Sequence, residues 1–405
     1  MSARTRSMNI LFVTISWPEK GKRNLYTDLI HKFSQEGHQV YVVSNRPRRN
    51  GNPTSYSAEE GIHVLRVKTG NITKTKPLEK SLSLLLLGWQ FRKAVNKYLG
   101  EESFDLILFN TPPITLSNLM KYLKQEFDCP LYVLLKDIWP YGFADMGLIK
   151  RNGWVYNYFR KHEKKIYELA DFIGCMSPKG IDFVLDQHPY LEPGKLEVCP
   201  NSISPNGNGV KMNSTIRKKY GIPMDATVFL FSGNLGLGHG LDYLSETILK
   251  MKDYKKAFFM IGGAGTYYSK LRKVFDKENP QNALLYSYLP EEEYKALIAT
   301  CDVGLILLDS KYTYPQFPSR LLSYLENKMA VLCAVNEETD IGEIVEEYKA
   351  GINTIHGDHE SFRIAIEKLC EDKQAVKKMG QQAWQLLKDK YEVTHSYQTI
   401  VKHFE

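Results

Sequence analysis

"TVFLFSGNLGLGHGLDYL", residues 227–244, joins an apolar run to a glycine-rich turn and then to a segment with helical spacing. A continuous apolar run of this length is typical of a strand that is buried on both faces, as in a parallel sheet. The same order recurs in residues 256–265, and further apolar runs follow at 283–290, 303–309 and 330–335. Alternating strands and helices predict a doubly wound α/β domain that binds ligands at the carboxyl ends of its strands.

The first half of the chain shows the same alternation. "MNILFVTI" (8–15) predicts a strand, and residues 25–44 continue with helical spacing that gives way at Gly37 to a second strand. Together they predict a βαβ unit with a parallel sheet. Three more runs, at residues 104–110, 131–137 and 171–177, each end in polar or small residues and extend this sheet.

The length of 405 residues suits two domains rather than one core. Residues 199–214 lose apolar periodicity and are rich in Pro, Gly, Asn and Ser, which predicts a linker. We therefore expect two Rossmann-like domains that face a central cleft. The expected bounds are 1–205 for the first domain and 213–385 for the second, with a C-terminal helix at 386–405 that packs back on the first.

Composition places the chain among ordered globular proteins, with 43% hydrophobic and 24% charged residues. Its six cysteines form no CxxC pair and have no His at zinc spacing, so they predict reduced core residues of a cytosolic protein. No secretion signal is recognisable at the N-terminus. The most apolar stretch, Leu82 to Phe91, is about half the length that spans a bilayer.

Positive charge is concentrated in residues 1–100, which hold 17 Lys and Arg against 6 Asp and Glu, a net +11, whereas the whole chain carries +7. Lysines and arginines flank Leu82 to Phe91, so this segment either lies on an anionic membrane surface or forms a core helix with solvated ends. Binding of nucleic acid is disfavoured, because the basic residues accompany no recognisable reading motif.

Two glycine-rich turns predict close approach of the backbone to a ligand. The first turn contains Gly233, Asn234, Gly236 and His239, and the second contains Gly262, Gly263 and Gly265. Neither fits the GxGxxG dinucleotide pattern or the GxxxxGK[ST] phosphate loop. Two such turns on successive strands favour one extended, phosphate-bearing ligand, while the alternative is a pair of ordinary tight turns.

"FPSRLLSYLENKMAVLCAV", residues 317–335, predicts a short helix followed by a strand. Ser319 is expected to cap the helix, so that the free amides of Arg320, Leu321 and Leu322 present positive charge to an anion. The fork of Arg320 fits phosphate oxygens, and a diphosphate leaving group is the expected guest. A capped helix with a surface arginine is the alternative.

The order of these motifs resembles the donor domain of the retaining GT-B glycosyltransferases of family 4. It runs from the two glycine turns through "YLPEEEY" (288–294) and "ATCDVGL" (299–305) to "PSRLLSYLENKMAVL" (318–332). The first half is similar to the bacterial O-antigen and capsule branch, the WbuB-like N-acetylfucosamine transferases, through "KDIWPYGFADMG" (136–147) and residues 175–180 and 195–203.

The resemblance implies a metal-independent hexosyltransferase-type enzyme that needs no cofactor. It would transfer a sugar, such as an N-acetylated deoxyhexosamine, from a UDP-sugar to a polyprenyl-diphosphate-linked glycan. This reaction belongs to surface polysaccharide (O-antigen, capsule or lipopolysaccharide) synthesis, at the inner face of the cytoplasmic membrane. The diphosphate would lie on Ser319 to Leu322 and on Asn234 to Gly240, with the base near Leu289.

The chain departs from the family at several donor positions. The family's Glu-x7-Glu pair falls on Pro315 and Ser323, so neither acid is present, and Glu326 is the candidate substitute. The Arg and Lys that many members carry in the first glycine turn are Asn234 and His239 here. A neutral His239 would donate one hydrogen bond, whereas a protonated one would bring charge to the diphosphate.

The acceptor side offers fewer candidates. Lys22 and Arg23 follow the first strand and either contact an anionic acceptor or form a solvated loop. Asp137 follows a strand and either orients the acceptor hydroxyl or caps its loop, and Trp139 is expected to contact the acceptor. Two other functions stay open: a UDP-sugar epimerase of similar shape and a catalytically inactive nucleotide-sugar-binding subunit.

Overall fold

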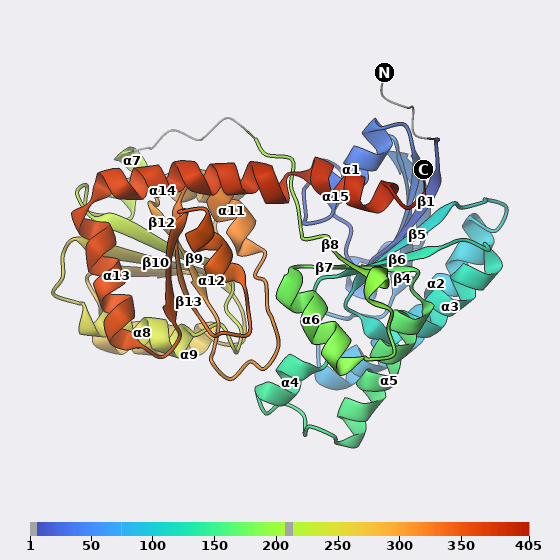
Figure 1. Cartoon of the computed structure of the whole chain (residues 1–405), viewed down its shortest axis with the longest axis horizontal. Coiled ribbons are helices and arrows are strands. Elements are labelled where there is room, and N and C mark those ends of the chain that lie inside the picture. The colour runs from blue at the N-terminus through green and yellow to red at the C-terminus, as the bar shows by residue number, and fades with distance from the viewer. Residues whose placement is uncertain (1–5, 74, 207–213, 405) are drawn as a thin grey trace. The chain divides into compact units, whose positions relative to one another are not determined.

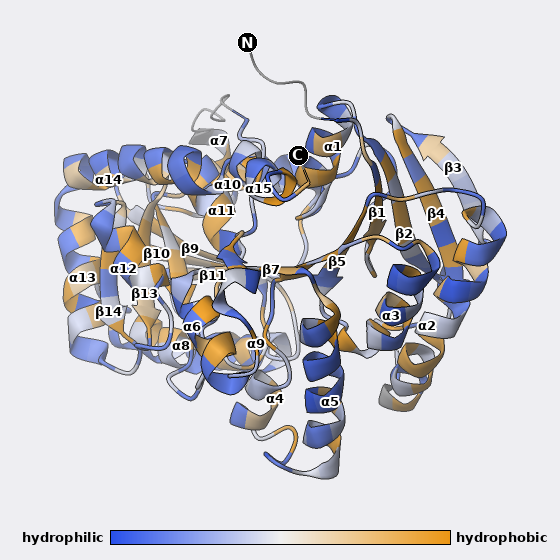
Figure 2. Cartoon of the chain, turned by 45° about the vertical axis from the view of Figure 1, so that its right-hand side comes forward, coloured by the Kyte–Doolittle hydropathy of each residue, from blue (hydrophilic) through white to orange (hydrophobic). Residues whose placement is uncertain are grey.

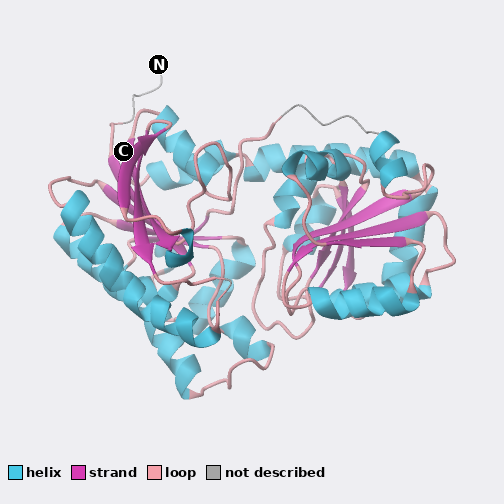
Figure 3. Ribbon diagram, turned by 180° about the vertical axis from the view of Figure 1, so that it is seen from behind, coloured by secondary structure: helices cyan, strands magenta, loops and turns pink. Residues whose placement is uncertain are grey.

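The structure is a computed structural model that describes residues 6–73, 75–206 and 214–404. The chain forms two compact units, Met1–Ile203 with Val393–Glu405, and Ser204–Glu392 (Figure 1). Each unit is an α/β domain whose central sheet is covered by helices on both faces (Figure 3). The predicted fold class, two Rossmann-like doubly wound domains, is confirmed.

The first unit is built on an eight-stranded sheet in the order β3-β4-β2-β1-β5-β6-β7-β8. Every neighbouring pair is parallel except β3 with β4 at the edge. The strands are β1 (Asn9–Val13), β2 (Gln39–Pro47), β3 (Ser55–Glu59), β4 (Ile62–Thr69), β5 (Leu106–Thr111), β6 (Leu131–Leu135), β7 (Phe172–Cys175) and β8 (Leu196–Val198). The α-helices are α1 (Thr27–Gln35), α2 (Pro77–Tyr98), α3 (Ser117–Glu126), α4 (Tyr141–Asp145), α5 (Trp154–Leu169) and α6 (Pro178–Gln187). Short 3₁₀ turns η1 (Arg48–Asn50), η2 (Ile114–Leu116) and η3 (Pro193–Lys195) complete the unit.

The second unit carries a six-stranded, wholly parallel sheet in the order β11-β10-β9-β12-β13-β14. Its strands are β9 (Thr227–Asn234), β10 (Ala257–Ala264), β11 (Ala283–Tyr286), β12 (Val303–Leu307), β13 (Ala330–Val335) and β14 (Gly351–Ile355). Its helices are α7 (Ser214–Lys219), α8 (Leu241–Lys250), α9 (Tyr268–Glu278), α10 (Glu291–Ile298), α11 (Arg320–Glu326), α12 (Ile341–Glu347), α13 (His359–Glu371) and α14 (Lys373–Leu386), followed by a π-helical turn η4 (Leu387–Tyr391).

The strand residues form the core of each unit because parallel sheets are covered on both faces. Figure 2 shows β1 and β2 largely in the hydrophobic colour, while much of α5 is hydrophilic. Five of the six cysteines are buried and none forms a disulfide, as the apolar surroundings of the cysteines predicted. No helix in the described part of the chain is long and apolar enough to cross a membrane.

The chain ends by returning to the first unit. Helix α15 (Val393–Val401) packs beside α1, and Tyr397 lies 3.0 Å from the ring nitrogen of His38 (Figure 1). The return begins at Val393, later than the expected boundary at 386, because Tyr391 is still buried in the second unit near Phe317.

The predicted linker, 199–214, differs from the structure at its start. Cys199 is buried, and its N–H donates to the carbonyl of Cys175 at 2.8 Å, so this part belongs to the first unit. Residues 207–213, which include the expected start of the second domain, lie outside the described residues.

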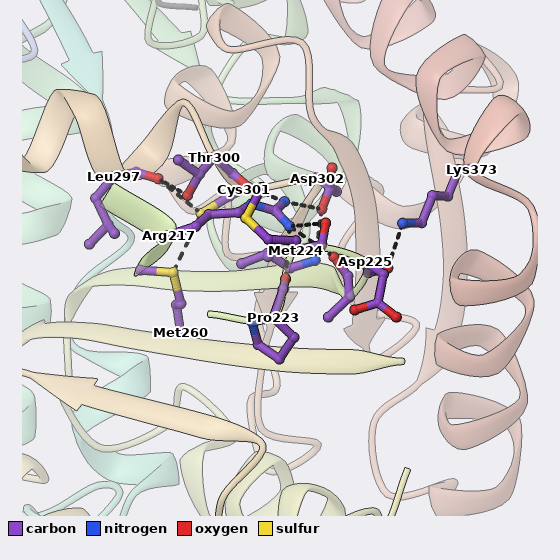
Figure 4. A network of polar contacts seen from close by, with 12 residues as sticks. Arg217, Pro223, Met224, Asp225, Met260, Leu297, Thr300, Cys301, Asp302 and Lys373 are labelled. Atoms are coloured by element: carbon purple, nitrogen blue, oxygen red, sulfur yellow. Dashed lines mark hydrogen bonds and ion pairs between the residues drawn. The ribbon is translucent and has the colours of Figure 1, made fainter. Parts of the chain in front are cut away.

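A buried arginine anchors the start of β9 (Figure 4). Nη1 of Arg217, on α7, donates to the carbonyls of Pro223, Met224 and Ala226. Its Nη2 donates to the Thr300 carbonyl at 2.9 Å and to the Asp302 carboxylate at 3.3 Å. Asp302 also accepts the N–H of Val228 at 2.8 Å. The cluster thus joins α7, the start of β9 and the turn before β12, and it fixes the strand that leads to the glycine turn.

Candidate active site

The two glycine turns lie side by side at the carboxyl ends of β9 and β10. The strand register pairs Gly263 with Gly233 and Ala264 with Asn234. A Cβ on Gly263 would lie 1.8 Å from the carbonyl oxygen of Gly233, and one on Gly265 would lie 2.2 Å from that of Leu235. These glycines are therefore required for the contact between the turns themselves.

Two glycines of the first turn have open space above them. Gly233 has φ +115°, and a Cβ there would meet nothing within 4 Å, while one at Gly236 would meet only the side chain of Asn234. Gly262 differs, because its Cβ would lie 1.9 Å from the ring of Tyr286. Of the predicted glycines, Gly233 and Gly236 are thus the ones with room for a ligand.

Arg320 lies against this open turn. Its Nη2 donates to the carbonyl of Asn234 at 3.3 Å, and its guanidinium carbon lies 3.9 Å from the ring centroid of Phe231. Nη1 is buried and has no hydrogen-bond partner. Among the described residues no carboxylate pairs with Arg320, and desolvation by burial lowers its pKa. A half-buried cation without a counterion is suited to bind an anionic ligand.

Two tyrosines near Arg320 contact Ser232 at the end of β9. Tyr324, one turn along α11, is fully buried, and its hydroxyl accepts the N–H of Ser232 at 3.3 Å. The hydroxyl of Tyr294 lies 3.1 Å from the hydroxyl of Ser232. Burial raises the pKa of Tyr324 to about 12, and the nearby charge of Arg320 opposes this rise. The tyrosines therefore stay protonated, and Tyr324 joins α11, and Tyr294 joins α10, to the end of β9.

His239 is neutral near pH 7. Burial, followed by the charge of Arg320, lowers the pKa of His239 to about 4, and its Nδ1 is buried without a partner. Of the two alternatives for this residue, the structure therefore favours the neutral imidazole. Such a ring can exchange one hydrogen bond with a ligand but adds no charge.

The start of α11 differs from the expected capped helix. Ser319 occupies the N-cap position, but its side chain makes no capping hydrogen bond. The amides of Leu321 and Leu322 are also occupied, because they donate to the carbonyls of Pro318 and Ser319 at 3.2 Å each. The expectation of free amides at these two residues was wrong, since the first turn closes on itself with 3₁₀-type bonds. Attraction for an anion therefore rests mainly on Arg320.

The positions around the missing glutamates are partly engaged. Ser323 is half-buried, and its carbonyl accepts from the backbone and side chain of Asn327 at 3.2 and 2.9 Å. Glu326 accepts the N–H of Asn206 at 3.1 Å, so one oxygen of the candidate substitute already has a partner. Leu289 is half-buried beside Tyr288, whose ring is 84% exposed and free to stack on a planar group.

In the first unit, Asp137 follows β6 at an exposed position, yet protein atoms surround its carboxyl, and this desolvation raises its pKa. Its charge also contributes to the raised pKa of Tyr26, after burial as the main cause. The side-chain amide of Asn110, at the end of β5, donates to the Tyr26 hydroxyl at 3.2 Å. The side-chain carbonyl oxygen of Asn110, Oδ1, is buried and without a partner. A polar cluster thus consists of Asp137, Tyr26 and Asn110. It can accept hydrogen bonds from a hydroxyl group and donate hydrogen bonds to it.

The other acceptor candidates have different surroundings. The ring of Trp139 lies 4.1 Å from that of Phe143 and 5.3 Å from that of Phe159, so it belongs to an aromatic cluster. Arg23 forms a two-pronged pair with Asp28, which compensates its charge. Lys22 is exposed. The described residues contain no group of three or more His, Cys, Asp or Glu that could hold a metal ion.

Comparison with protein families agrees with this geometry. Residues 21–206 match the family described as Glycosyltransferase Family 4, and residues 212–385 match Glycosyl transferases group 1. The chain belongs to the family 4 glycosyltransferases of the GT-B type. A curated relative, a probable glycosyltransferase named WbjE from Pseudomonas aeruginosa, is 23% identical over 377 residues, which cover 82% of this chain and 90% of that protein.

Solved structures of similar fold support the GT-B assignment. Sucrose-phosphate synthase from Thermosynechococcus elongatus has a TM-score of 0.75 at 14% identity, over 98% of both chains. HepE from Anabaena, solved in complex with UDP and glucose, has a TM-score of 0.70 at 16% identity, over 98% of this chain and 99% of that one. At these identities the likeness shows the fold alone.

Sequence reasoning missed several residues of this glycosyltransferase that surround the candidate groups. Tyr324 was recognisable from its spacing of four residues from Arg320, which puts both on one helix face. No such signal marked Tyr294, Phe231 and Asn110. They belong to separate elements, which come close to the candidate residues only in the folded chain.

Proposed function

We propose that this glycosyltransferase transfers a sugar from a UDP-sugar to a polyprenyl-diphosphate-linked glycan, with retention of the anomeric configuration. The observation that carries the proposal is Arg320, a half-buried guanidinium without an acid partner beside the open glycine turn. A diphosphate leaving group is the ligand that such a group stabilises as its charge develops. HepE, a protein of the same fold, was solved with UDP-glucose, which supports a UDP-sugar as donor.

In the proposed reaction the bond between the anomeric carbon and the diphosphate oxygen breaks. The acceptor oxygen bonds to that carbon on the same face, and the hydroxyl proton passes to the departing diphosphate. Asp137 and the side-chain carbonyl oxygen of Asn110 accept hydrogen bonds from the acceptor and orient it. Leaving-group stabilisation by Arg320 supplies most of the catalysis, and no metal ion or other cofactor is part of the proposal.

The lipid-linked acceptor is proposed from helix α2. Its stretch from Leu82 to Phe91 is only half buried: Leu87 and Phe91 are in the core, whereas other residues project outward. The exposed residues are Leu78 (84%), Leu82 (58%), Leu85 (64%), Leu86 (45%) and Trp89 (62%). Exposed lysines and an arginine flank this face at Lys80, Arg92 and Lys93. An apolar face bordered by positive charge fits the surface of an anionic membrane, where a lipid-linked acceptor lies.

The likeness to WbjE at 23% identity supports, within this proposal, a role in bacterial surface polysaccharide synthesis. We further propose that the protein belongs to the WbuB-like branch and uses a hexosamine-type donor sugar, such as an N-acetylated deoxyhexosamine. A membrane-bound acceptor would place the protein at the inner face of the cytoplasmic membrane.

The decisive experiment is a binding and turnover assay with purified protein and a panel of UDP-, GDP- and dTDP-sugars. It is run with and without a detergent-solubilised polyprenyl-diphosphate glycan. We expect selective binding of one UDP-sugar and release of UDP only when the acceptor is present, and NMR of the product should show the anomeric configuration of the donor. Absence of nucleotide binding would overturn the proposal and favour an inactive subunit, while UDP release without sugar transfer would favour an epimerase.

A further inference from the structure

The first unit contains a recess that neither the fold nor the proposed donor chemistry explains. Its volume is about 240 Å³, and it lies at the carboxyl ends of β1, β2 and β4. Its lining includes Ser16, Trp17, Asn45, Arg46, Arg49 and Arg66. Parallel sheets of this type bind their ligands at this end of the strands.

Two of the three arginines carry charge that no acid neutralises by contact. Nη1 of Arg46 donates to the carbonyl of Pro53 at 3.1 Å and to the hydroxyl of Ser55 at 3.0 Å. Arg49 donates from both terminal nitrogens to the carbonyl and hydroxyl of Thr73. Among the described residues, no carboxylate forms an ion pair with Arg46 or Arg49. Neutral acceptors thus hold both guanidinium groups in place and leave their charge available to a ligand.

The third arginine is compensated. Arg66 is 3% exposed and pairs with Glu59, and the carboxylate of Glu19 lies 4.0 Å from its Nε. Glu19, the acid in the wall of the recess, is 69% exposed. The three arginines, set against Glu19 and Glu59, leave the recess with a net positive charge.

We propose that this recess binds a phosphate or diphosphate group of the acceptor. Planar guanidinium groups that are fixed in advance recognise phosphate oxygens through paired N–H donors. The inference rests on the proposed function, because it gives the acceptor of that reaction its anionic part. It also differs from the sequence-based expectation, which assigned this role to Lys22 and Arg23.

The position of α2 relative to the recess fits a lipid-linked diphosphate. Thr73 lines the recess, and the apolar exposed face of α2 begins five residues later at Leu78. Glu79 fixes this junction, because it accepts hydrogen bonds from Arg48 at 3.1 Å and Asn71 at 2.8 Å. A lipid on the exposed face of α2 would bring its phosphates to the arginines. A water-soluble sugar phosphate offers the same group without the lipid, so the experiment needs both kinds of acceptor.

The test measures binding of inorganic pyrophosphate to fluorotryptophan-labelled protein by ¹⁹F NMR. The chain has five tryptophans, and the variant Trp17→Phe assigns the resonance of the one in the recess. We expect pyrophosphate to shift the Trp17 resonance, and Arg46→Gln and Arg49→Gln to weaken this binding about tenfold or more. Arg6→Gln is the matched control, since Arg6 lies in the same unit, its side chain is 82% exposed and it does not line the recess. Its effect should stay within about twofold.

Two further arms keep the inference separate from the proposed function. Farnesyl diphosphate and a hexose 6-phosphate replace pyrophosphate; tighter binding of the first identifies a lipid source, and equal or tighter binding of the second a soluble one. Arg49→Lys should restore part of the affinity, which a folding defect would not allow. An unshifted Trp17 resonance, or equal losses in Arg6→Gln and Arg49→Gln, would overturn the inference. Lack of UDP release with an intact Trp17 titration would instead reject only the proposed function.

Discussion

At the scale of single residues, Arg320 combines a cation–π contact, a bond to a turn carbonyl and an unpaired Nη1. Each feature has a physical consequence: Phe231 restricts the guanidinium, the Asn234 carbonyl orients it, and the unpaired nitrogen can donate to a ligand. Because the family's glutamates are replaced at Pro315 and Ser323, no acid offsets this charge from those positions. In the proposed reaction, Arg320 therefore bears more of the leaving-group stabilisation than the family pattern implies.

We expect Arg320→Ala to reduce kcat/KM for the UDP-sugar by a factor that corresponds to at least about 2 kcal/mol of transition-state stabilisation. Arg320→Lys, the matched control, keeps the charge but loses the planar fork, so its loss should be smaller. Steady-state kinetics with a thermal melt for each variant provide the measurement. Unchanged turnover in Arg320→Ala would reject the role in leaving-group stabilisation.

His239 gives a prediction about acid stability. Because its folded pKa is about 4 and the ordinary value is 6.5, the unfolded chain binds a proton between these pH values and the folded chain does not. Stability should therefore fall as the pH drops below 6.5, by about 2 kcal/mol between pH 7 and pH 5.

The variant His239→Gln lacks this titration, so urea unfolding should show a smaller loss over the same pH range. His395, an exposed histidine on α15, is the control, and His395→Gln should retain the wild-type dependence. Equal pH dependence in His239→Gln and the wild-type protein would show that His239 does not titrate with a depressed pKa.

At the scale of elements, the turns after β9 and β10 show how one glycine pattern serves two purposes. Gly263 and Gly265 let the two turns touch, whereas Gly233 and Gly236 leave space above the first turn. Both purposes produce the same letters in the sequence. The strand register, which aligns Gly263 with Gly233, decides which glycine does which.

The Arg217 cluster should control the stability of the second unit. Arg217→Leu leaves several buried carbonyls without a donor, so we expect urea unfolding to show a loss of at least about 2 kcal/mol. Lys373→Leu is the matched control, because Lys373 is exposed and bonds only the Asp225 carbonyl of the same region. Its effect should stay within about 0.5 kcal/mol. A similar loss in both variants would mean that the cluster contributes nothing beyond the surface bond.

Helix α2 gives a prediction for membrane binding. Replacing Leu82 and Leu85 with Glu should weaken co-sedimentation with anionic lipid vesicles about tenfold, because it removes exposed apolar side chains and adds repulsive charge. Ile364→Glu makes the same kind of change on α13, where Ile364 is 50% exposed, and should have little effect. Wild-type protein that stays in the supernatant would reject the membrane role of α2.

At the scale of the whole molecule, the chain folds its last helix into the unit where it began. Val393, Tyr397, Ile400 and Val401 belong to the same hydrophobic core as the strands β1 and β2. Truncation or mutation near the C-terminus should therefore affect the first unit, although the residues just before it belong to the second.

Ile400→Ala tests this arrangement. Ile400 is fully buried, so the cavity should destabilise the first unit by about 2–4 kcal/mol, while UDP binding, proposed for the second unit, is retained. Gln398→Ala, on the exposed face of the same helix, should leave both properties unchanged. Unfolding can be followed by calorimetry and UDP binding by titration. Loss of UDP binding in Ile400→Ala at a temperature where the protein is folded would contradict the division of roles.

The sequence by itself determined the fold class, the parallel strands with apolar runs and the family. These follow from local patterns, because buried strands need continuous apolar residues and tight turns need glycine. Its limits appear at weaker patterns: β3, β4, β8 and β14 are short or interrupted by polar residues and carry no continuous apolar run, so they were missed.

Only the tertiary structure decided the chemistry around the candidate residues. The neutral state of His239, the occupied amides of Leu321 and Leu322 and the unpaired Nη1 of Arg320 depend on neighbours from separate elements. The recess with Arg46 and Arg49 likewise forms where the ends of three strands meet. Desolvation and hydrogen bonding are properties of surroundings in space, and a sequence pattern specifies them only within one element.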